Sequence, residues 1–173
     1  MTVYVYIVLL TGIFCTAELL LRSFGLIFPF CALFIFYTAT AFGTGRGILC
    51  ACLGALTLDF IGTGASHPWS LLIFAFIVWM ASFWLNKVES ESILLNFLPG
   101  LAIPFLVWVP SVLFFAQNRW HVLLEQFPGM FPAAVISGIW LPVMIFLLDM
   151  LNEKLALPLY TDAKMKRKML SLL

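Results

Sequence analysis

The sequence predicts an all-α integral membrane protein with six transmembrane helices. Hydrophobic residues make up 64% of the 173 residues and charged residues only 10%. A soluble domain carries roughly 25% charged residues, so this composition predicts that lipid is the surrounding solvent. A chain in lipid must satisfy its own backbone hydrogen bonds, which favours helices, and the alternating pattern of a membrane barrel is absent.

The length accommodates about six spans of roughly 20 residues and leaves no room for a folded soluble domain. We therefore treat the chain as one transmembrane domain. The apolar segments place the spans at residues 2–21, 24–42, 47–66, 68–86, 93–117 and 132–151.

The first span, residues 2–21, has no basic segment before it and is expected to be an uncleaved helix. Glu18 stands four residues before Arg22, a spacing that predicts an ion pair at the membrane interface. The alternative is that Glu18 faces a cavity or a partner. The second span, residues 24–42, has Pro29 in its first turns and aromatic residues all round it, which we interpret as exposure to lipid.

The third span, residues 47–66, carries small residues at helical spacing. Gly47, Ala51 and Gly54 form one stripe, and a neighbouring line runs through Asp59. Small residues let membrane helices approach closely. We therefore expect this helix to be central in the bundle, with Asp59 facing protein.

Asp59 needs a specific explanation, because a carboxylate at the centre of the membrane costs about 2.5 to 3.5 kcal/mol on insertion scales. Three roles stay open from the sequence. The acid is a structural hydrogen-bond or ion-pair site, it lines a partner or substrate surface, or it relays protons. A relay usually needs a second titratable group in line, and the other spans carry no mid-membrane charge.

The fourth span, residues 68–86, has tryptophans near both ends that suit membrane interfaces. The fifth span, residues 93–117, contains three prolines. Each proline removes a backbone donor, so we expect a kinked or partly unwound helix. The three prolines are Pro99, Pro104 and Pro110.

Residues 119–131 are too polar and too short to cross a membrane, and we expect an interfacial or re-entrant segment there. The last span, residues 132–151, has Pro142 in its middle and Asp149 near its end. A basic tail, residues 152–173, follows it, with a weakly amphipathic helix over 162–173. We interpret the tail as a membrane-surface or topology signal, and we expect no nucleic-acid partner.

The distribution of basic residues predicts that both termini are cytoplasmic. Six spans put the termini on one side, and seven of the nine lysines and arginines fall on that side. This bias follows the positive-inside rule. The seven residues are Arg46, Lys87, Lys154, Lys164, Lys166, Arg167 and Lys168.

The sequence predicts no metal, cofactor or catalytic site. The pair Cys50-x-Cys52 lacks the spacing of a zinc site, and we expect the cysteines to be packing residues. His67 and His121 lack the spacing of histidine metal motifs. We therefore interpret both histidines as loop residues that bind water and backbone.

Two stretches of the chain resemble the rod shape-determining MreD family. The third span carries a glycine, apolar residues, an aspartate and further glycines, and the last span carries an aromatic-Leu-Pro core before a basic tail. The matching residues are Gly54, Asp59, Gly62 and Gly64 in the third span, with Trp140 and Pro142 in the last span.

The resemblance implies a fold similar to the membrane-embedded S-components of energy-coupling-factor transporters. It implies a non-enzymatic scaffold in the bacterial inner membrane, without a cofactor, whose matching residues serve structure or partner binding. The implied partners are an MreC-like single-span protein and, through it, a SEDS-type glycosyltransferase, a penicillin-binding transpeptidase and MreB. The scaffold would act in peptidoglycan synthesis during cell elongation.

Two other functions stay open from the sequence. The first is a substrate-binding subunit of a vitamin-type transporter, with an outward pocket lined by Asp59, His67 and Trp69. The second is a proton-coupled carrier that uses Asp59.

Overall fold

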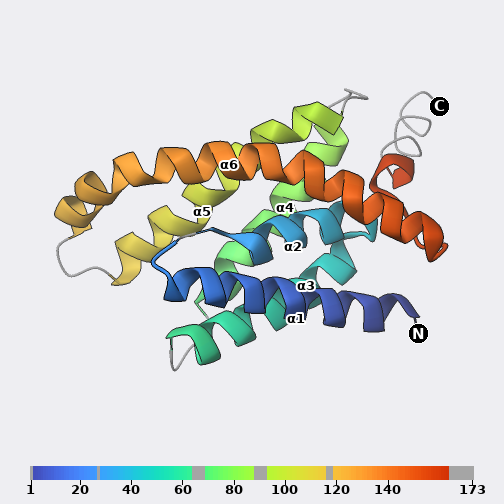
Figure 1. The fold of residues 1–173 in the computed structure, drawn as a ribbon, viewed down its shortest axis with the longest axis horizontal. Helices are drawn as coiled ribbons and strands as arrows, with labels where there is room; N and C mark the ends of the chain where they lie inside the picture. The colour runs from blue at the N-terminus through green and yellow to red at the C-terminus, as the bar shows by residue number, and fades with distance from the viewer. Residues whose placement is uncertain (1, 27, 64–68, 88–92, 116–118, 164–173) are drawn as a thin grey trace.

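In the computed structural model, the described residues are 2–26, 28–63, 69–87, 93–115 and 119–163, and every regular element among them is helical. Figure 1 shows the helices running side by side in alternating directions. The α-helices are α1 (Thr2–Ser23), α2 (Phe30–Ala41), α3 (Thr44–Leu56), α4 (Ser70–Lys87), α5 (Phe97–Phe115) and α6 (Arg119–Lys154). The π-helix η1 (Thr57–Thr63) continues α3, and the 3-10 turn η2 (Ile93–Asn96) precedes α5.

The predicted all-helical, membrane-type character is confirmed. Three helical stretches are long and apolar enough to cross a membrane: Val3–Ser23, Thr44–Ile61 and Phe127–Lys154. Three shorter apolar helices lie between them in the chain, at Phe30–Ala41, Ser70–Asn86 and Phe97–Pro110. Six full spans stay a prediction.

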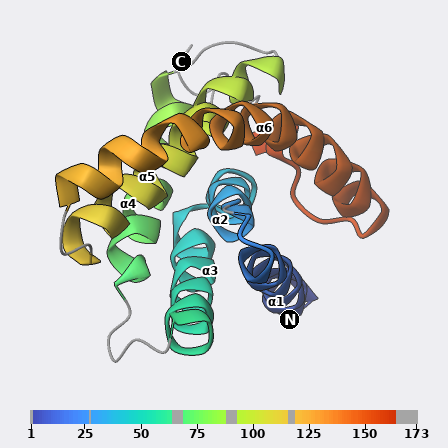
Figure 2. The same cartoon turned by 60° about the vertical axis from the view of Figure 1, so that its left-hand side comes forward.

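The helices form two groups around α2. Figure 2 shows α5 and α6 arching over one side of α2, with α1 and α3 on the other side. The start of α1 and the end of α6 lie at one end of the bundle, together with the α2–α3 turn (Figure 1). The α1–α2 connection and the start of α6 lie at the opposite end, which places the polar contacts described below at two separate levels.

The central helix is α2, so the expectation that the third span is central was wrong. Residues Cys31 to Ala41 of α2 are all buried, including Phe34 and Tyr37. The aromatic side chains Phe34, Phe36 and Tyr37 of this helix therefore pack against protein and not against lipid, whereas Phe24, before the helix, is exposed. A helix that is apolar all round suits either environment, because lipid and a membrane-protein interior are equally apolar.

The start of α2 also differs from the prediction. The helix begins at Phe30, and Pro29 is the residue before it. Gly25 has a φ of 76°, a conformation that side chains rarely adopt, and it turns the chain after α1. The α1–α2 connection therefore occupies residues that we expected to be helical.

The small-residue face of α3 packs on α2, as the spacing of Gly47, Ala51 and Gly54 suggested. A methyl group added at Gly47 would lie 2.7 Å from the Cβ of Ala39, and one added at Gly54 would lie 2.5 Å from the sulfur of Cys31. Both distances are shorter than any normal contact, so only glycine permits this approach. The two backbones are therefore held close along the length of α3.

The last two helices are more regular than predicted. The helix α5 continues through Pro104 and Pro110 without the expected unwinding. Residues 119–131 are continuous with the last span, and together they form the single helix α6. A re-entrant segment is therefore not observed here, because the internal hydrogen bonds of the helix continue through its polar turns and past Pro128 and Pro132. An interfacial position for residues 119–131 stays a prediction.

After α6 the chain folds back on the helix end. Ala156 takes the left-handed conformation with a φ of 52°, and the amide of Leu157 donates to the carbonyl of Asn152 at 2.9 Å. A short helical turn follows at residues 160–163. The helix predicted over 162–173 falls largely outside the described residues.

Candidate functional site

Asp59 lies in the π-helix η1, where the wider turn carries it to the start of α4. Its two carboxylate oxygens accept hydrogen bonds from Ser70, one from the backbone amide at 2.8 Å and one from the hydroxyl at 2.6 Å. The first amides of a helix have no partner within the helix, and a negative charge there is favourable. Asp59 is only 6% exposed, so it faces protein as expected and caps α4.

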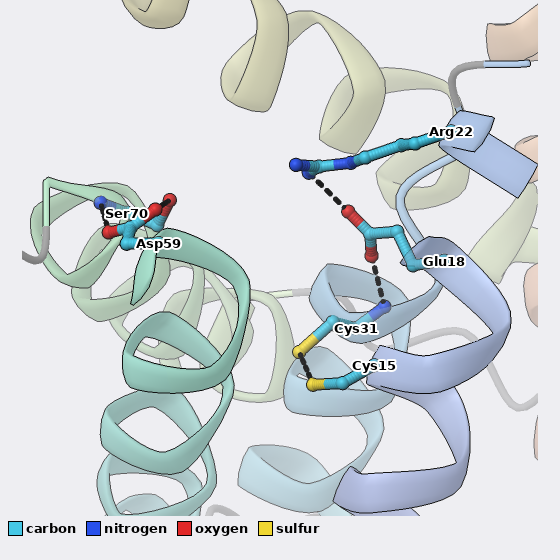
Figure 3. Close-up of polar contacts among 6 residues, drawn as sticks. All are labelled: Cys15, Glu18, Arg22, Cys31, Asp59 and Ser70. Atoms are coloured by element: carbon cyan, nitrogen blue, oxygen red, sulfur yellow. Dashed lines mark hydrogen bonds and ion pairs between the residues drawn. The ribbon is translucent and has the colours of Figure 1, made fainter. Parts of the chain in front are cut away.

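The Glu18–Arg22 pair predicted from the i, i+4 spacing is present. The guanidinium of Arg22 lies 2.6 Å from Glu18, whose other oxygen accepts the amide of Cys31 at 2.9 Å. Figure 3 shows Glu18 and Arg22 on α1 with Cys31 on α2, apart from Asp59 and Ser70 on η1 and α4. Glu18 and Asp59 therefore serve separate structural contacts and do not form one cluster.

The two halves of the family-like motif meet α2 at consecutive residues. Gly54 approaches Cys31, and the indole ring of Trp140 packs edge-on against the ring of Phe30 at 5.9 Å between centroids. Pro142 is buried in α6 one half-turn further on. These motif residues, 86 positions apart at Gly54 and Trp140, therefore contribute to the packing of the same helix.

Two of the predicted site residues, Gly62 and Gly64, lie at or beyond the limit of the described residues. Gly62 lies in η1, beyond Asp59. Gly64 and His67 lie outside the described residues. The roles predicted for these residues stay predictions.

The α6 groove is an apolar depression of about 440 Å³ between the α1–α2 connection and the first half of α6. On α6 it exposes small residues at i, i+4 spacing, Gly129 and Ala133, and a methyl group added at Gly129 would meet nothing within 4 Å. Glu125 is its one acidic lining residue and pairs with His121 at 3.2 Å. The full lining is Leu21, Gly25, Leu26, Phe28, Glu125, Gly129, Met130, Pro132, Ala133 and Ile136.

A buried hydrogen-bond network at the opposite end was not predicted. Asp149 accepts the hydroxyl of Tyr37 at 2.8 Å and the amide of Tyr160 at 3.0 Å. Asn152 donates to the same Tyr37 oxygen at 2.8 Å. We call this the Asp149 network, and it comprises Trp84, Asn96, Tyr37, Asp149, Asn152 and Tyr160.

The second half of the Asp149 network reaches α4 and η2. Asn96 is fully buried, and its side-chain oxygen accepts the indole N–H of Trp84 at 3.1 Å and the hydroxyl of Tyr160. Burial raises the pKa of Tyr160 to about 12, so its hydroxyl stays a donor at neutral pH. The sequence signal was the set of polar side chains Asp149, Asn152 and Tyr160 around the end of the last span, which we had interpreted as a span end and a tail.

No metal centre is evident in the part of the chain that the structure describes, where no group of three or more His, Cys, Asp or Glu side chains could hold an ion. Cys15 and Cys31 lie 3.5 Å apart between their sulfur atoms and are fully buried. They act as packing residues between α1 and α2.

The fold and the contacts together define a helical protein of membrane type in which Glu18, Asp59 and Asp149 accept hydrogen bonds that join different helical segments. In comparisons with known proteins, no family model, no curated protein and no solved structure matches the chain.

Proposed function

We propose that this chain is a non-enzymatic scaffold of the bacterial elongation machinery, in the manner of the MreD family that its motifs resemble. It would lie in the inner membrane with both termini in the cytoplasm and bind an MreC-like single-span protein. Through that partner it would act on a SEDS-type glycosyltransferase, a penicillin-binding transpeptidase and MreB. The resemblance supplies these partner classes.

The α6 groove is the observation that best supports a scaffold. A membrane helix packs on another where small residues allow its backbone to approach, because lipid supplies no hydrophobic driving force between them. Gly129 and Ala133 offer such a surface with open space above it. The acids that first suggested chemistry, Asp59 and Glu18, are held by Ser70 and Arg22 and so support the packing of the bundle.

The experiment is site-specific photocrosslinking in cells. A photoreactive amino acid replaces Ile136, which lines the groove and is 55% exposed, or Trp79 on α4, which is 60% exposed and lies away from it. We expect crosslinks to an MreC-like protein from position 136 and none from position 79. Equal crosslinking from both positions, or normal cell width after deletion of the chain, would refute the scaffold.

The volume of the groove also suits a small molecule, since ligand pockets measure about 300–1,000 Å³. This observation keeps the vitamin-type transporter subunit as the second candidate. Native mass spectrometry of the purified protein separates the two functions. A retained vitamin-sized ligand, lost on Ala133→Trp, would favour the transporter subunit.

A further inference from the structure

The two helices α5 and α6 form one body. Gly100 and Gly138 bring their backbones together, because a methyl group added at Gly100 would lie 2.7 Å from the carbonyl oxygen of Ser137. Nearer the groove, the ring of Phe105 contacts those of Phe127 and Phe131 at about 6 Å between centroids. These contacts between α5 and α6 extend from the middle of α6 into its first half. The two helices therefore resist bending relative to each other.

Within this body, α6 packs on the main core mainly through its second half, whereas α5 joins the same core through Ile103. Side chains of α6 that join the main core are Leu141, Met144, Ile145 and Leu148, all in its second half. In its first half, Met130 belongs to a separate small cluster with Trp108 and Val112 of α5. The groove lies beside this first half.

Hydrogen bonds strengthen the same end. Tyr37 of α2 donates to Asp149 and accepts from Asn152, and Trp84 of α4 donates to Asn96 of η2, just before α5. Beside the groove, α2 meets α6 through the edge contact of Phe30 with Trp140, whose indole N–H has no hydrogen-bond partner. An aromatic edge contact tolerates sliding more readily than a hydrogen bond to a carboxylate does.

We infer that α5 and α6 pivot as one body about the Tyr37–Asp149 contact, and that this pivot sets the width of the α6 groove. About 20 residues of helix separate Asp149 from Gly129, a lever of about 30 Å. A rotation of about 5° at Asp149 then moves Gly129 by about 3 Å, which is enough to admit or exclude a side chain. The inference concerns the movement of α6 and holds whatever occupies the groove.

Distances between two spin labels in the full chain, reconstituted in nanodiscs, test the pivot. One label pair spans the groove, at Leu26→Cys and Gly129→Cys, in a Cys52→Ser background. A second pair lies within the moving body, at Leu113→Cys and Leu124→Cys. All four positions are exposed, and a side chain at Gly129 enters open space.

We expect Tyr37→Phe to broaden the distribution of distances between the labels at positions 26 and 129, or to shift its mean, by about 3 Å, the displacement that the lever predicts. The distance between the labels at positions 113 and 124 should stay unchanged. The matched control is Thr161→Val, which removes a 3.3 Å hydrogen bond to Asp149 without touching α2. That control should keep the groove distance of the unmodified protein. If Tyr37→Phe is too unstable to purify, Asp149→Asn makes the same comparison.

Two results would overturn the pivot. The first is an unchanged groove distance in folded Tyr37→Phe and Asp149→Asn proteins. The second is an equal change in both label pairs, which would show local loosening of α5 and α6 in place of a movement as one body.

Discussion

The hydroxyl of Tyr37 donates to the carboxylate of Asp149 at 2.8 Å, across 112 positions of sequence. This contact joins the central helix α2 to the end of α6. The same carboxylate accepts the amide of Tyr160 and so fixes the chain after α6. One acid therefore connects three segments at the end of the bundle where the chain begins.

Removing the Tyr37 hydroxyl should destabilise the protein. Tyr37→Phe leaves Asp149 and Asn152 with one partner fewer in a buried setting, and we expect a loss of about 2 kcal/mol. Unfolding in mixed micelles, followed by far-ultraviolet circular dichroism, measures the change. Thr161→Val should cost less than half as much. Equal losses in the free energy of unfolding would show that the Tyr37 contact stabilises the protein no more than the Thr161 contact does.

A methyl group at Gly54 should disrupt the contact of α3 with α2. Gly54→Ala places a carbon against the sulfur of Cys31, and we expect a loss of about 1–3 kcal/mol from overpacking. Gly12→Ala is the matched control, because Gly12 lies in α1 with nothing within 4 Å. That control should gain about 0.5–1 kcal/mol, since alanine favours a helix. A neutral Gly54→Ala would contradict the observed packing.

Asp59 and Ser70 should show energetic coupling. Asp59→Ala should cost about 1–2 kcal/mol, as the loss of a helix cap does. In a double-mutant cycle, Ser70→Ala should cost much less once Asp59 is absent, because the hydroxyl of Ser70 then has no carboxylate of Asp59 to donate to. Additive losses would mean that Asp59 stabilises the protein through other contacts. The hydroxyl of Thr16, which bonds within α1, provides a control in Thr16→Ala.

Alkaline pH should release the Tyr160 contact. Burial raises the pKa of Tyr160 from its ordinary value of 10.0 to about 12 in the folded protein, so folding favours the protonated form. Its contribution to stability is therefore complete below pH 10 and disappears as the pH rises toward 12. The tyrosinate absorbance of the unmodified protein minus that of Tyr160→Phe measures this titration. A midpoint near 10 in the folded protein would show that Tyr160 is not buried.

The class of protein could be predicted because hydrophobicity is a local property that composition and runs of sequence report directly. The packing face of α3 could also be predicted, since small residues at helical spacing have few other uses in a membrane. The burial of Asp59 followed from that face. The ion pair of Glu18 with Arg22 followed from a spacing of four residues within one helix.

The central position of α2 could not be predicted by the same reasoning. Phe34 and Phe36 would be as stable against lipid as against protein, so such apolar side chains carry no signal that separates the two environments. The Asp149 network was missed for a different reason. Its members come from α2, α4, η2 and both sides of the α6 terminus, and their proximity depends on how the helices pack.

The short length of α2 bears on how the protein is made. Twelve helical residues extend only about 18 Å, whereas a bilayer core measures about 30 Å. The helix also exposes almost no side chain to its surroundings, so entry into lipid alone would gain little for it. We therefore expect α2 to leave the insertion machinery together with α1 and α3, as a preassembled three-helix unit, and not as a separate span. Biogenesis of this protein would then depend on the close packing of α3 on α2 at Gly47 and Gly54 before synthesis of α6 is complete.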